Sequence, residues 1–443
     1  MIFFSDVAGL TTLAEHDITL TTDEPIHSKA YPLPHNMQEV VDAEIDTMLK
    51  LGIIETSTSA YASPIVLVRK PDGSNRVCVD FRKINKVTVF DPEPMPQPEQ
   101  IFAKLKRDRY FSTFDVTKGY WQIPMSTRSK PYTTFVTHQG LHQFRVMPFG
   151  LVNAPATFNR MMRKLLNNND SLDSYVDDVL AHTVDWLHHL CTLRDFFTRV
   201  RDAHLTLKPS KCRVGFMSVP YLGHKVGNSQ LETKPEMIDR ILQAPRPTDK
   251  KQLRSFLGLV GYYRRFIPNF AAVAVPLTDL TKKGTPNRIV WEDAQERAFQ
   301  ALRAHIASPP VLRLPDFSKE FIVQTDACDD GIGSVLLQEE LGVKHPVAFA
   351  SKKLLPRERN YFTIEKECLA IVWSIQKFQN YLYGKPFTLE TDHQPLQYLG
   401  KAQFQNGRLM RWALALQPYR YTIRAIKGSD NVGADFLSRH VSE

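Results

Sequence analysis

The sequence predicts a chain of mixed α and β structure that divides into about three units. Its 443 residues are more than one hydrophobic core normally holds. Strand-like apolar runs end in acidic residues in two separate regions, one near Asp177 and one near Asp326. Between them, residues 232–290 change to helical patterns with basic surfaces. We therefore expect two regions of strands and helices joined by a mainly helical segment.

Charge and cysteine content narrow the class of protein. Lys and Arg number 56 against 47 Asp and Glu, so the net charge is +9, which suits a polyanionic partner. The five cysteines are widely spaced and include no CxxC pair, which argues against a disulfide framework and a zinc knuckle. Met1-Ile-Phe-Phe is too short for a signal peptide, and no apolar run approaches the length of a membrane span. We expect an intracellular, cytoplasmic protein with no membrane partner.

The first third of the chain predicts a helix, a hairpin and a loop, in that order. Residues 1–35 are mixed and turn-rich, and an apolar stripe then predicts a helix from Asn36 to Gly52. Strand-like runs at 64–70 and 76–81 flank Pro71-Asp72-Gly73-Ser74, a strong turn signal. Residues 91–98 form a proline-rich loop, followed by a short helix from about residue 101.

The sequence Tyr175-Val176-Asp177-Asp178 reads as the tip of a hairpin that carries two adjacent acids. Such a pair on its own is typical of a solvated turn. A third acid, Asp115, ends the strand-like run from residue 110, so a sheet can bring it beside the pair. Three carboxylates from two strands can hold two divalent cations, the arrangement that in-line phosphoryl transfer needs.

A second acidic region follows residue 316. Its predicted order is strands at 321–326, 332–338 and 347–350, a helix from 358 to 381, a strand at 387–392, a helix, a strand at 419–426 and a last helix. Asp326 and Asp392 end strands, where an aspartate commonly caps the next element. Amphipathic helices are also expected at 186–204 and from Trp291 to Ile306.

Three motifs, FDVTKGYWQI, MPFGLVNAPATF and YVDD, resemble in this order the catalytic core of a retroelement reverse transcriptase. From about residue 10 to 440 the chain is most similar to the pol polyprotein of Ty3/gypsy-type LTR retrotransposons. The resemblance implies an α+β polymerase right hand (fingers, palm, thumb) followed by an α/β ribonuclease H-like domain. The implied boundaries are 1–35 for an N-terminal extension, 36–228 for fingers and palm, 229–315 for thumb and connection, and 316–443 for ribonuclease H.

The resemblance assigns the acids to two catalytic sites that each bind two Mg²⁺, with Mn²⁺ as the alternative ion. For the second site the sequence offers two candidates at each of two positions: Glu365 or Glu367 on the helix, and Asp430 or Asp435 near the C-terminus. The motifs around Glu367 and Asp435 match the family, and we choose these two. The predicted catalytic and metal-binding residues are Asp115, Asp177, Asp178, Asp326, Glu367, Asp392 and Asp435, with Val116 as a further metal contact.

The resemblance also implies substrate-binding residues. Lys70, or Arg69 in its place, and Arg76 would hold the triphosphate of the incoming nucleotide. Tyr120 matches the residue that excludes a ribose 2′-hydroxyl, although an aromatic after a strand is more often core. Phe149 and Gly150 would line the nucleotide pocket, Tyr175 and Val176 would lie at the hairpin, and Gly223 would belong to the primer grip. Lys211 would contact phosphate.

We therefore expect an RNA-directed DNA polymerase with ribonuclease H activity, either cut from a longer retrotransposon polyprotein or encoded by an incomplete gene model. Its expected location is the cytoplasm, with a virus-like particle as the alternative. Its expected partners are an RNA template, a DNA primer, the RNA-DNA hybrid and dNTPs, with a second copy or other polyprotein products as further candidates. No protease, zinc-knuckle or integrase motif is visible. The alternative is a catalytically silent nucleic-acid-binding subunit or a domesticated relic.

Overall fold

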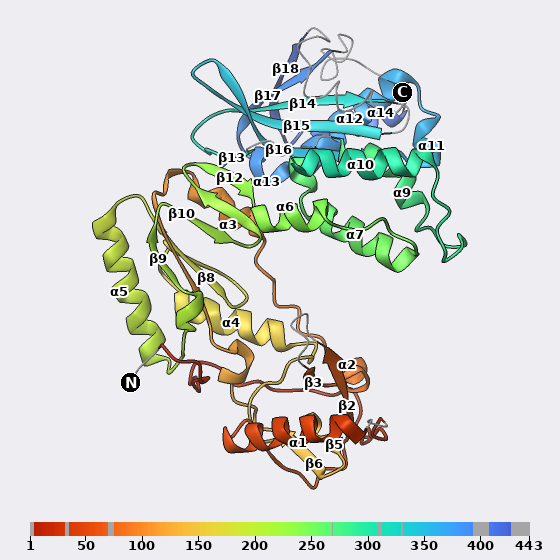
Figure 1. Ribbon diagram of the computed structural model, residues 1–443. Helices are drawn as coiled ribbons and strands as arrows, with labels where there is room; N and C mark the ends of the chain where they lie inside the picture. The colour runs from red at the N-terminus through yellow and green to blue at the C-terminus, as the bar shows by residue number, and fades with distance from the viewer. Residues whose placement is uncertain are drawn as a thin grey trace. The chain divides into compact units, whose positions relative to one another are not determined.

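The computed structural model describes residues 4–31, 35–69, 75–267, 269–307, 312–328, 331–392 and 407–426. The chain forms two compact units. The first contains residues 1–101 and 107–222, and the second contains residues 102–106 and 223–443 (Figure 1).

A five-stranded sheet and helix α1 form one part of the first unit. The strand order is β1-β6-β5-β2-β3. The predicted helix is confirmed, and Gly52 follows it with a φ of +68°, which L side chains disfavour. The predicted hairpin is confirmed too, with Ile65 opposite Val79, while its turn lies outside the described residues. The bounds are α1 (His35–Lys50), β1 (Ile54–Thr56), β2 (Ser63–Arg69), β3 (Asn75–Val79), β5 (Phe135–Thr137) and β6 (Gly140–Phe144).

A second sheet of the first unit, ordered β7-β8-β4-β9, carries the acid pair. Helices α4 and α5 pack on one of its faces, where apolar side chains of the strands meet those of the helices. For example, the rings of Phe114 and Phe196 lie 4.9 Å apart. The bounds are β4 (Tyr110–Asp115), β7 (Leu172–Tyr175), β8 (Asp178–Thr183), β9 (Arg213–Phe216), α4 (Ala154–Leu166) and α5 (Trp186–Asp202).

Shorter elements complete the first unit, except that residues 102–106, which end α3 and begin η1, belong to the second unit. Residues 91–97 form neither helix nor strand, as the proline-rich sequence predicts, and a helix begins at Pro98. The remaining bounds are α2 (Arg82–Val87), α3 (Pro98–Lys104), β10 (Ser218–Tyr221) and the 3₁₀ helices η1 (Leu105–Arg107), η2 (Gly119–Gln122), η3 (Lys130–Thr133) and η4 (Pro209–Lys211).

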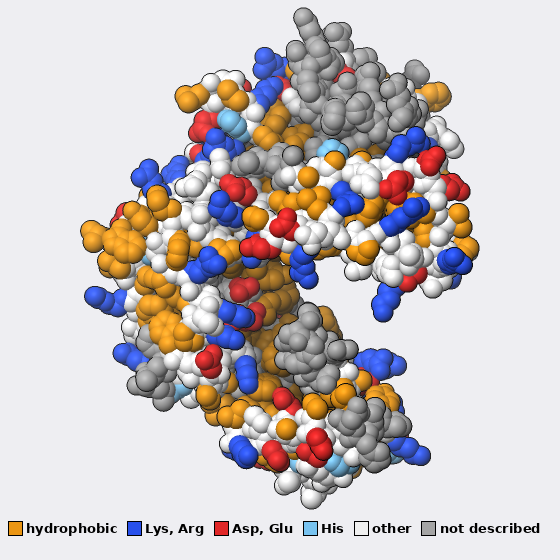
Figure 2. Space-filling view, in the orientation of Figure 1, with side chains coloured by type: hydrophobic (Ala, Val, Ile, Leu, Met, Phe, Trp, Pro, Cys, Tyr) orange, Lys and Arg blue, Asp and Glu red, His pale blue; other side chains and the backbone are white. Residues whose placement is uncertain are grey.

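Apolar side chains gather on the surface of the first unit over α5 and β9 (Figure 2). Gly215 of β9 lies against Trp186, because a Cβ at this glycine would come within 3.0 Å of the indole ring. This close approach joins the two elements into one surface. The exposed residues are Val184, Trp186, Leu187, Leu190, Val214, Phe216 and Met217.

The second unit contains a mainly helical part, as the sequence pattern of residues 232–290 predicts. Apolar residues of α7 pack on α10, with the rings of Phe256 and Phe299 4.7 Å apart. Strand β12 pairs antiparallel with β11 and β13. The bounds are β11 (His224–Gly227), β12 (Gln230–Thr233), α6 (Pro235–Leu242), α7 (Lys250–Tyr262), η5 (Arg264–Phe266), α8 (Phe270–Val273), α9 (Val275–Asp279), α10 (Asp293–Ala307) and β13 (Leu312–Arg313).

The rest of the second unit is a five-stranded sheet ordered β16-β15-β14-β17-β18, in which β14, β17 and β18 run parallel. Helix α12 packs over the core of this sheet and beside α14. The predicted strands are confirmed. The bounds are β14 (Phe321–Ala327), β15 (Gly331–Glu340), β16 (Val343–Lys353), β17 (Pro386–Thr391), β18 (Arg420–Ala425) and α14 (Gly407–Leu416).

The prediction of one helix from residue 358 to 381 is wrong, because the chain forms three helices there: α11 (Pro356–Arg359), α12 (Thr363–Lys377) and α13 (Gln379–Leu382). The side chain of Glu358 accepts a hydrogen bond from the amide of Leu355 and so caps α11. Phe362 adopts extended backbone and starts a new helix. Across the described ranges, the structure contains no helix that is both long and apolar enough to cross a membrane.

Candidate active sites

The first candidate site lies where β4 and β8 meet. Asp115 pairs with Asp178 in the antiparallel register, so their side chains share one face of the sheet. Asp177 stands at the tip of the β7–β8 hairpin, where its carbonyl accepts a hydrogen bond from the amide of Val116 at 3.2 Å. The three acids predicted from the sequence are therefore brought together with Val116.

The hairpin tip is held in a strained conformation. Tyr175 pairs with Asp178, and Val176 has a φ of +53°. A β-branched residue in this left-handed region is a genuine outlier and costs about 1–3 kcal/mol. The surrounding packing must supply that energy, and Val176 packs against the large core of the first unit.

Lys211 counters part of the negative charge at this site. Its Nζ donates to Asp115 Oδ2 at 2.6 Å, and the pKa of Lys211 is raised by this bond and by the charges of Asp177 and Asp178. Although Asp177 is exposed by surface area, the protein around it displaces enough water to raise its pKa, and the charge of Asp115 adds to the rise. Within the described ranges, no three acidic, His or Cys side chains close around a potential ion.

A stack of three side chains lies beside the acids. The rings of Tyr120 and Phe149 are 5.1 Å apart with an angle of 28°, and the guanidinium of Arg76 lies 4.7 Å from the centre of the Phe149 ring. Burial raises the pKa of Tyr120, and the charge of Asp177 adds to the effect. The structure thus brings together Arg76, Tyr120 and Phe149 next to Asp177.

The backbone around this stack is tightly fitted. Gly150 has a φ of +96°, and its carbonyl accepts a hydrogen bond from Asn85 Nδ2 at 2.8 Å. A Cβ on Gly119 would lie 2.8 Å from the ring of Phe158, which also contacts Tyr120. Of the other residues predicted to bind the nucleotide, Lys70 lies outside the described residues.

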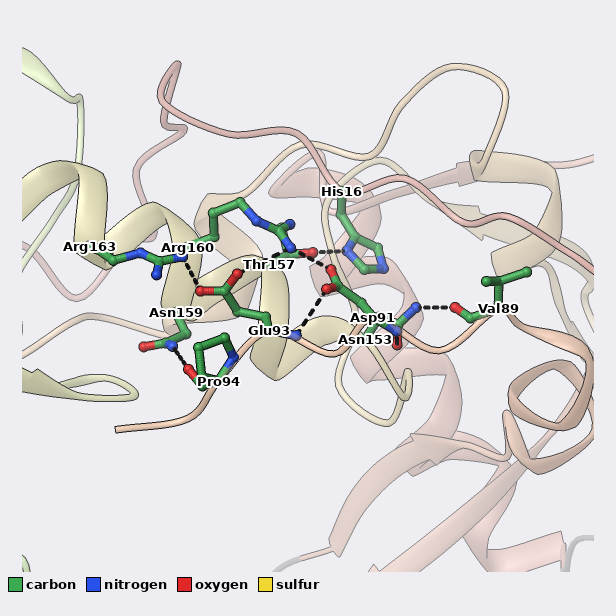
Figure 3. A network of polar contacts seen from close by, with 10 residues as sticks. All are labelled: His16, Val89, Asp91, Glu93, Pro94, Asn153, Thr157, Asn159, Arg160 and Arg163. Carbon is green, nitrogen blue, oxygen red and sulfur yellow. Dashed lines mark hydrogen bonds and ion pairs between the residues drawn. The ribbon is translucent and has the colours of Figure 1, made fainter. Parts of the chain in front are cut away.

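A polar network holds the start of α4 against the proline-rich loop (Figure 3). Asn153 donates to the carbonyl of Val89 at 2.8 Å and accepts from the amide of Asp91 at 3.1 Å. Arg160 bonds Asp91 at 2.7 Å. His16 contacts Thr157 at 2.8 Å, and burial lowers its pKa to about 4, so its ring is neutral at physiological pH. Since α4 also carries Phe158, this network fixes one wall of the Tyr120 stack.

Gly223, the predicted primer-grip residue, lies in a tight turn between β10 and β11. Its φ is +75°, and its carbonyl accepts a hydrogen bond from the hydroxyl of Tyr263 at 2.9 Å. A Cβ here would lie 3.0 Å from Tyr262, whose ring stacks on His224. Tyr263 itself is buried and belongs to the core.

The second candidate site lies at the ends of β14 and β17. These strands run parallel with Gln324 opposite Glu390, which brings Asp326 and Asp392, each two residues further on, to the same edge. Glu367 of α12 reaches them from above the sheet, where its Oε1 accepts a bond from the amide of Ala327 at 3.3 Å.

Glu367 is a carboxyl held in a low-dielectric position. Burial raises its pKa to about 8, and the charges of Asp326 and Asp392 add to the rise. Its Oε2 is buried without a hydrogen-bond partner in the described part of the chain. Glu365 instead caps α12 by accepting from the amide of Phe362, and its other oxygen pairs with Arg408. Asp435 and its competitor Asp430 lie outside the described residues.

Sequence reasoning missed the contact of Lys211 with Asp115 and the network around α4. Lys211 was assigned to phosphate, and nothing in its local sequence points to Asp115, 96 residues away. A signal for the network was present, because two acids interrupt the proline-rich loop and two arginines lie on one face of α4. Those residues are Asp91, Glu93, Arg160 and Arg163.

Two protein families match parts of the chain. The family described as reverse transcriptase (RNA-dependent DNA polymerase) matches residues 68–226. The family described as the RNase H-like domain found in reverse transcriptase matches residues 316–419. Members of these two domain families generally use divalent metal ions.

Curated relatives are Pol polyproteins of transposons. The chain is 40% identical over 437 residues to that of transposon 297 from Drosophila melanogaster, covering 97% of the chain and 41% of the relative. It is 36% identical to that of transposon gypsy from the same organism, covering 98% and 44%. It is 33% identical to the transposon Tf2-3 polyprotein of Schizosaccharomyces pombe, covering 97% and 33%. The chain thus spans less than half the length of these relatives.

Solved structures of a foamy viral protease-reverse transcriptase have the same fold. One, in complex with RNA/DNA hybrid, is 25% identical with a TM-score of 0.82, covering 96% of this chain and 58% of that chain. Another, in complex with dsDNA, is 25% identical with a TM-score of 0.84, covering 95% and 89%. The predicted fold class is confirmed. The chain therefore carries a reverse transcriptase domain and the RNase H-like domain found in reverse transcriptases, and it is similar over most of its length to Pol polyproteins of transposons that include gypsy.

Proposed function

We propose that the chain synthesises DNA on an RNA template at the first site and cleaves the RNA of RNA-DNA hybrids at the second. The single observation that carries the proposal is the pairing of Asp115 with Asp178 beside Asp177 and the Tyr120 stack. A carboxylate cluster next to an aromatic and guanidinium stack is the combination that nucleotidyl transfer to a growing strand requires.

The donor sets fit divalent cations. Carboxylates are the ligands that Mg²⁺ prefers. Burial raises the pKa values of Asp177 and Glu367, and the charges of the neighbouring carboxylates add to both rises, so a cation at either site would favour the ionised forms. Asp115, Asp177, Asp178 and Val116 would hold two Mg²⁺ in the first site, with Mn²⁺ as a substitute. Asp326, Glu367 and Asp392, together with Asp435, would do so in the second. When bound, the ions supply charge neutralisation and an activated oxygen nucleophile.

Arg76, Phe149 and Tyr120 prepare the site for a dNTP. Arg76 is exposed and lies over an aromatic face, so its donors are free to turn toward a triphosphate. Tyr120 contacts the rings of both Phe149 and Phe158, which restrict its movement away from a ribose 2′-hydroxyl. We therefore infer that this stack selects deoxynucleotides, with Lys70 as a second triphosphate contact.

The strained hairpin and the primer-grip turn hold the growing strand. Tyr175 and Val176 immediately precede Asp177, and we infer that a 3′ end placed at the acids contacts both residues. Gly223 provides a turn whose carbonyl is fixed by Tyr263. The proposed partners are accordingly an RNA template, a DNA primer and the hybrid that they form. A second copy of the chain is a further proposed partner.

The test is primer extension on an RNA template with dNTPs and Mg²⁺, beside cleavage of a labelled hybrid. Asp177→Asn should abolish extension and leave cleavage, and Asp326→Asn should do the reverse. Asp202→Asn, at an exposed position at the end of α5, serves as the matched control and should change neither activity. A folded wild-type chain that binds primer-template but neither extends nor cleaves would favour a catalytically silent binding subunit.

A further inference from the structure

His182 lies buried between two carboxylates in the first unit. Its Nδ1 is 2.8 Å from Asp108 Oδ2, and its Nε2 is 3.0 Å from Asp173 Oδ2. The side chains of His182, Asp108 and Asp173 are 5%, 11% and 15% exposed. Neither aspartate belongs to the acids assigned to metal binding, so this triad is separate from the active site.

The geometry fixes the charge of the ring. An ionised carboxylate only accepts hydrogen bonds, and a neutral imidazole donates from one nitrogen only. Because both nitrogens of His182 face carboxylates, the ring needs both protons to satisfy them. Burial by itself would lower the pKa of His182, but the hydrogen bonds to Asp108 and Asp173 outweigh it and raise the pKa.

The triad lies on the same face of the sheet as the catalytic acids. The register pairs Asp115 with Asp178 and Phe111 with His182, and residues 178 and 182 of one strand face the same side. Asp173 belongs to β7, and Asp108 precedes β4. His182 therefore ties together the three segments that carry Tyr175, Asp178 and Asp115.

The opposite face of the sheet offers a contrast. His189 of α5 is also buried, but its ring contacts the hydroxyls of Ser112 and Thr183 at 2.8 and 3.0 Å. Hydroxyls donate as well as accept, so a neutral ring satisfies both. Burial lowers the pKa of His189, in line with a neutral ring.

We propose that His182 is a positioning residue for polymerisation, in that its doubly bonded imidazolium fixes the strands that present the catalytic acids. This inference rests on the proposed polymerase function. At about 3.3 Å per residue, His182 lies four residues or about 13 Å along the strand from Asp178 and acts only through the backbone. The titratable groups that face it are Asp108, Asp173 on β7 and His189 on α5, with Tyr221 of β10 near Asp173.

The proposal predicts a specific dependence of extension on pH. Because the pKa of His182 is raised, the contribution of the triad is complete below the ordinary histidine value of 6.5 and is lost as the pH rises through the folded value. Extension by the wild-type chain should therefore fall on the alkaline side. Asp173→Asn removes one anionic partner, so it should move this fall to lower pH.

The experiment compares the wild-type chain with His182→Gln, Asp173→Asn and the control His189→Gln. Single-turnover extension is measured from pH 6 to 9 over a range of dNTP concentrations, and hybrid cleavage by the second unit reports on folding. His182→Gln should slow extension by up to about 100-fold with little change in the KM for dNTP, and it should lose the alkaline fall. His189→Gln should keep the wild-type pH profile.

A second readout tests the protonation directly. Selective ¹⁵N labelling of histidine rings should show, at pH 6.5, a mainly doubly protonated imidazole that disappears in His182→Gln. A neutral His182 at that pH, or a His182→Gln chain with wild-type rate and pH profile, would overturn the inference. If His182→Gln loses cleavage as well as extension, the pH profile of Asp173→Asn tests the inference in its place. An alkaline fall of extension at the wild-type pH in Asp173→Asn would then overturn it. A wild-type chain that cleaves hybrids but does not extend refutes the polymerase function itself.

Discussion

Replacing Glu367 by Gln should stabilise the metal-free second unit, although Glu367 is a predicted catalytic residue. The buried carboxyl has a pKa raised from 4.5 to about 8, so the folded state binds more protons than the unfolded state between these values. Stability therefore falls as pH rises through that window. Gln has nearly the same shape and no charge, so it avoids this loss.

The size of the effect follows from the shift. At 1.36 kcal/mol per pKa unit, the shift lowers the free energy of unfolding of the metal-free wild-type chain by at most about 3 kcal/mol at pH 7 and about 5 kcal/mol above pH 8, relative to acid pH. Glu367→Gln should therefore match the wild-type chain at pH 4.5 and exceed its free energy of unfolding by a growing margin at higher pH. With Mg²⁺ the margin should shrink or reverse, because the wild-type carboxylate then gains a cation.

The assay is urea unfolding in EDTA at pH 4.5, 7 and 8.5, followed by hydrogen exchange of peptides from α12 and β14. Glu365→Gln is the matched control, because it lies on the same helix, is also buried and accepts the capping bond from Phe362. Weakening that cap should destabilise the unit by about 1 kcal/mol at every pH. The reasoning would be refuted if Glu367→Gln had the same free energy of unfolding as the wild-type chain at pH 8.5. It would also be refuted if the variant exceeded the wild-type chain by the same amount at all three pH values.

Three further predictions concern the first site, the primer-grip turn and the network around α4. Lys211→Met should lower the stability of the metal-free chain by less than about 1 kcal/mol, because Lys211 is more than half exposed, and should lower the Mg²⁺ concentration for half-maximal extension. Thermal unfolding in EDTA and a Mg²⁺ titration measure the two effects. Tyr263→Phe leaves the carbonyl of Gly223 without its donor, so extension should weaken while hybrid cleavage persists, with a cost of about 1 kcal/mol in unfolding experiments. Arg160→Met releases the proline-rich loop and should raise the KM for dNTP by at most about tenfold, in steady-state extension assays, without affecting cleavage.

The sequence was sufficient to predict most of the strands and to group the acids that lie at strand ends. Asp115 ends an alternating run and Asp178 begins another, and such positions meet when the two strands pair. The same reasoning holds for Asp326 and Asp392 on parallel strands. Period-two patterns and strand ends are local properties, so one sequence is enough to find them.

Other features depend on contacts that local patterns do not encode. Helix α12 is buried on every side from Glu365 to Val372, so the periodicity of its residues carried no information about which glutamate faces the sheet. The breaks that begin α12 and α13 lie at Phe362 and Phe378, neither of which is a helix-breaking residue. His182 meets Asp108 across 74 residues of sequence, which only the folded sheet reveals.

The repulsion among the carboxylates is reduced in a different way at each of the two sites. In the first, an ammonium group from Lys211 lies on Asp115 and offsets the repulsion among the acids. In the second, the raised pKa of Glu367 shows that a proton does so at neutral pH. A cation that enters the first site must displace a side chain, whereas one that enters the second must displace a proton. It follows that, as the pH falls below 8, the second site should lose metal affinity through protonation of Glu367, so the two sites should differ in their sensitivity to acid.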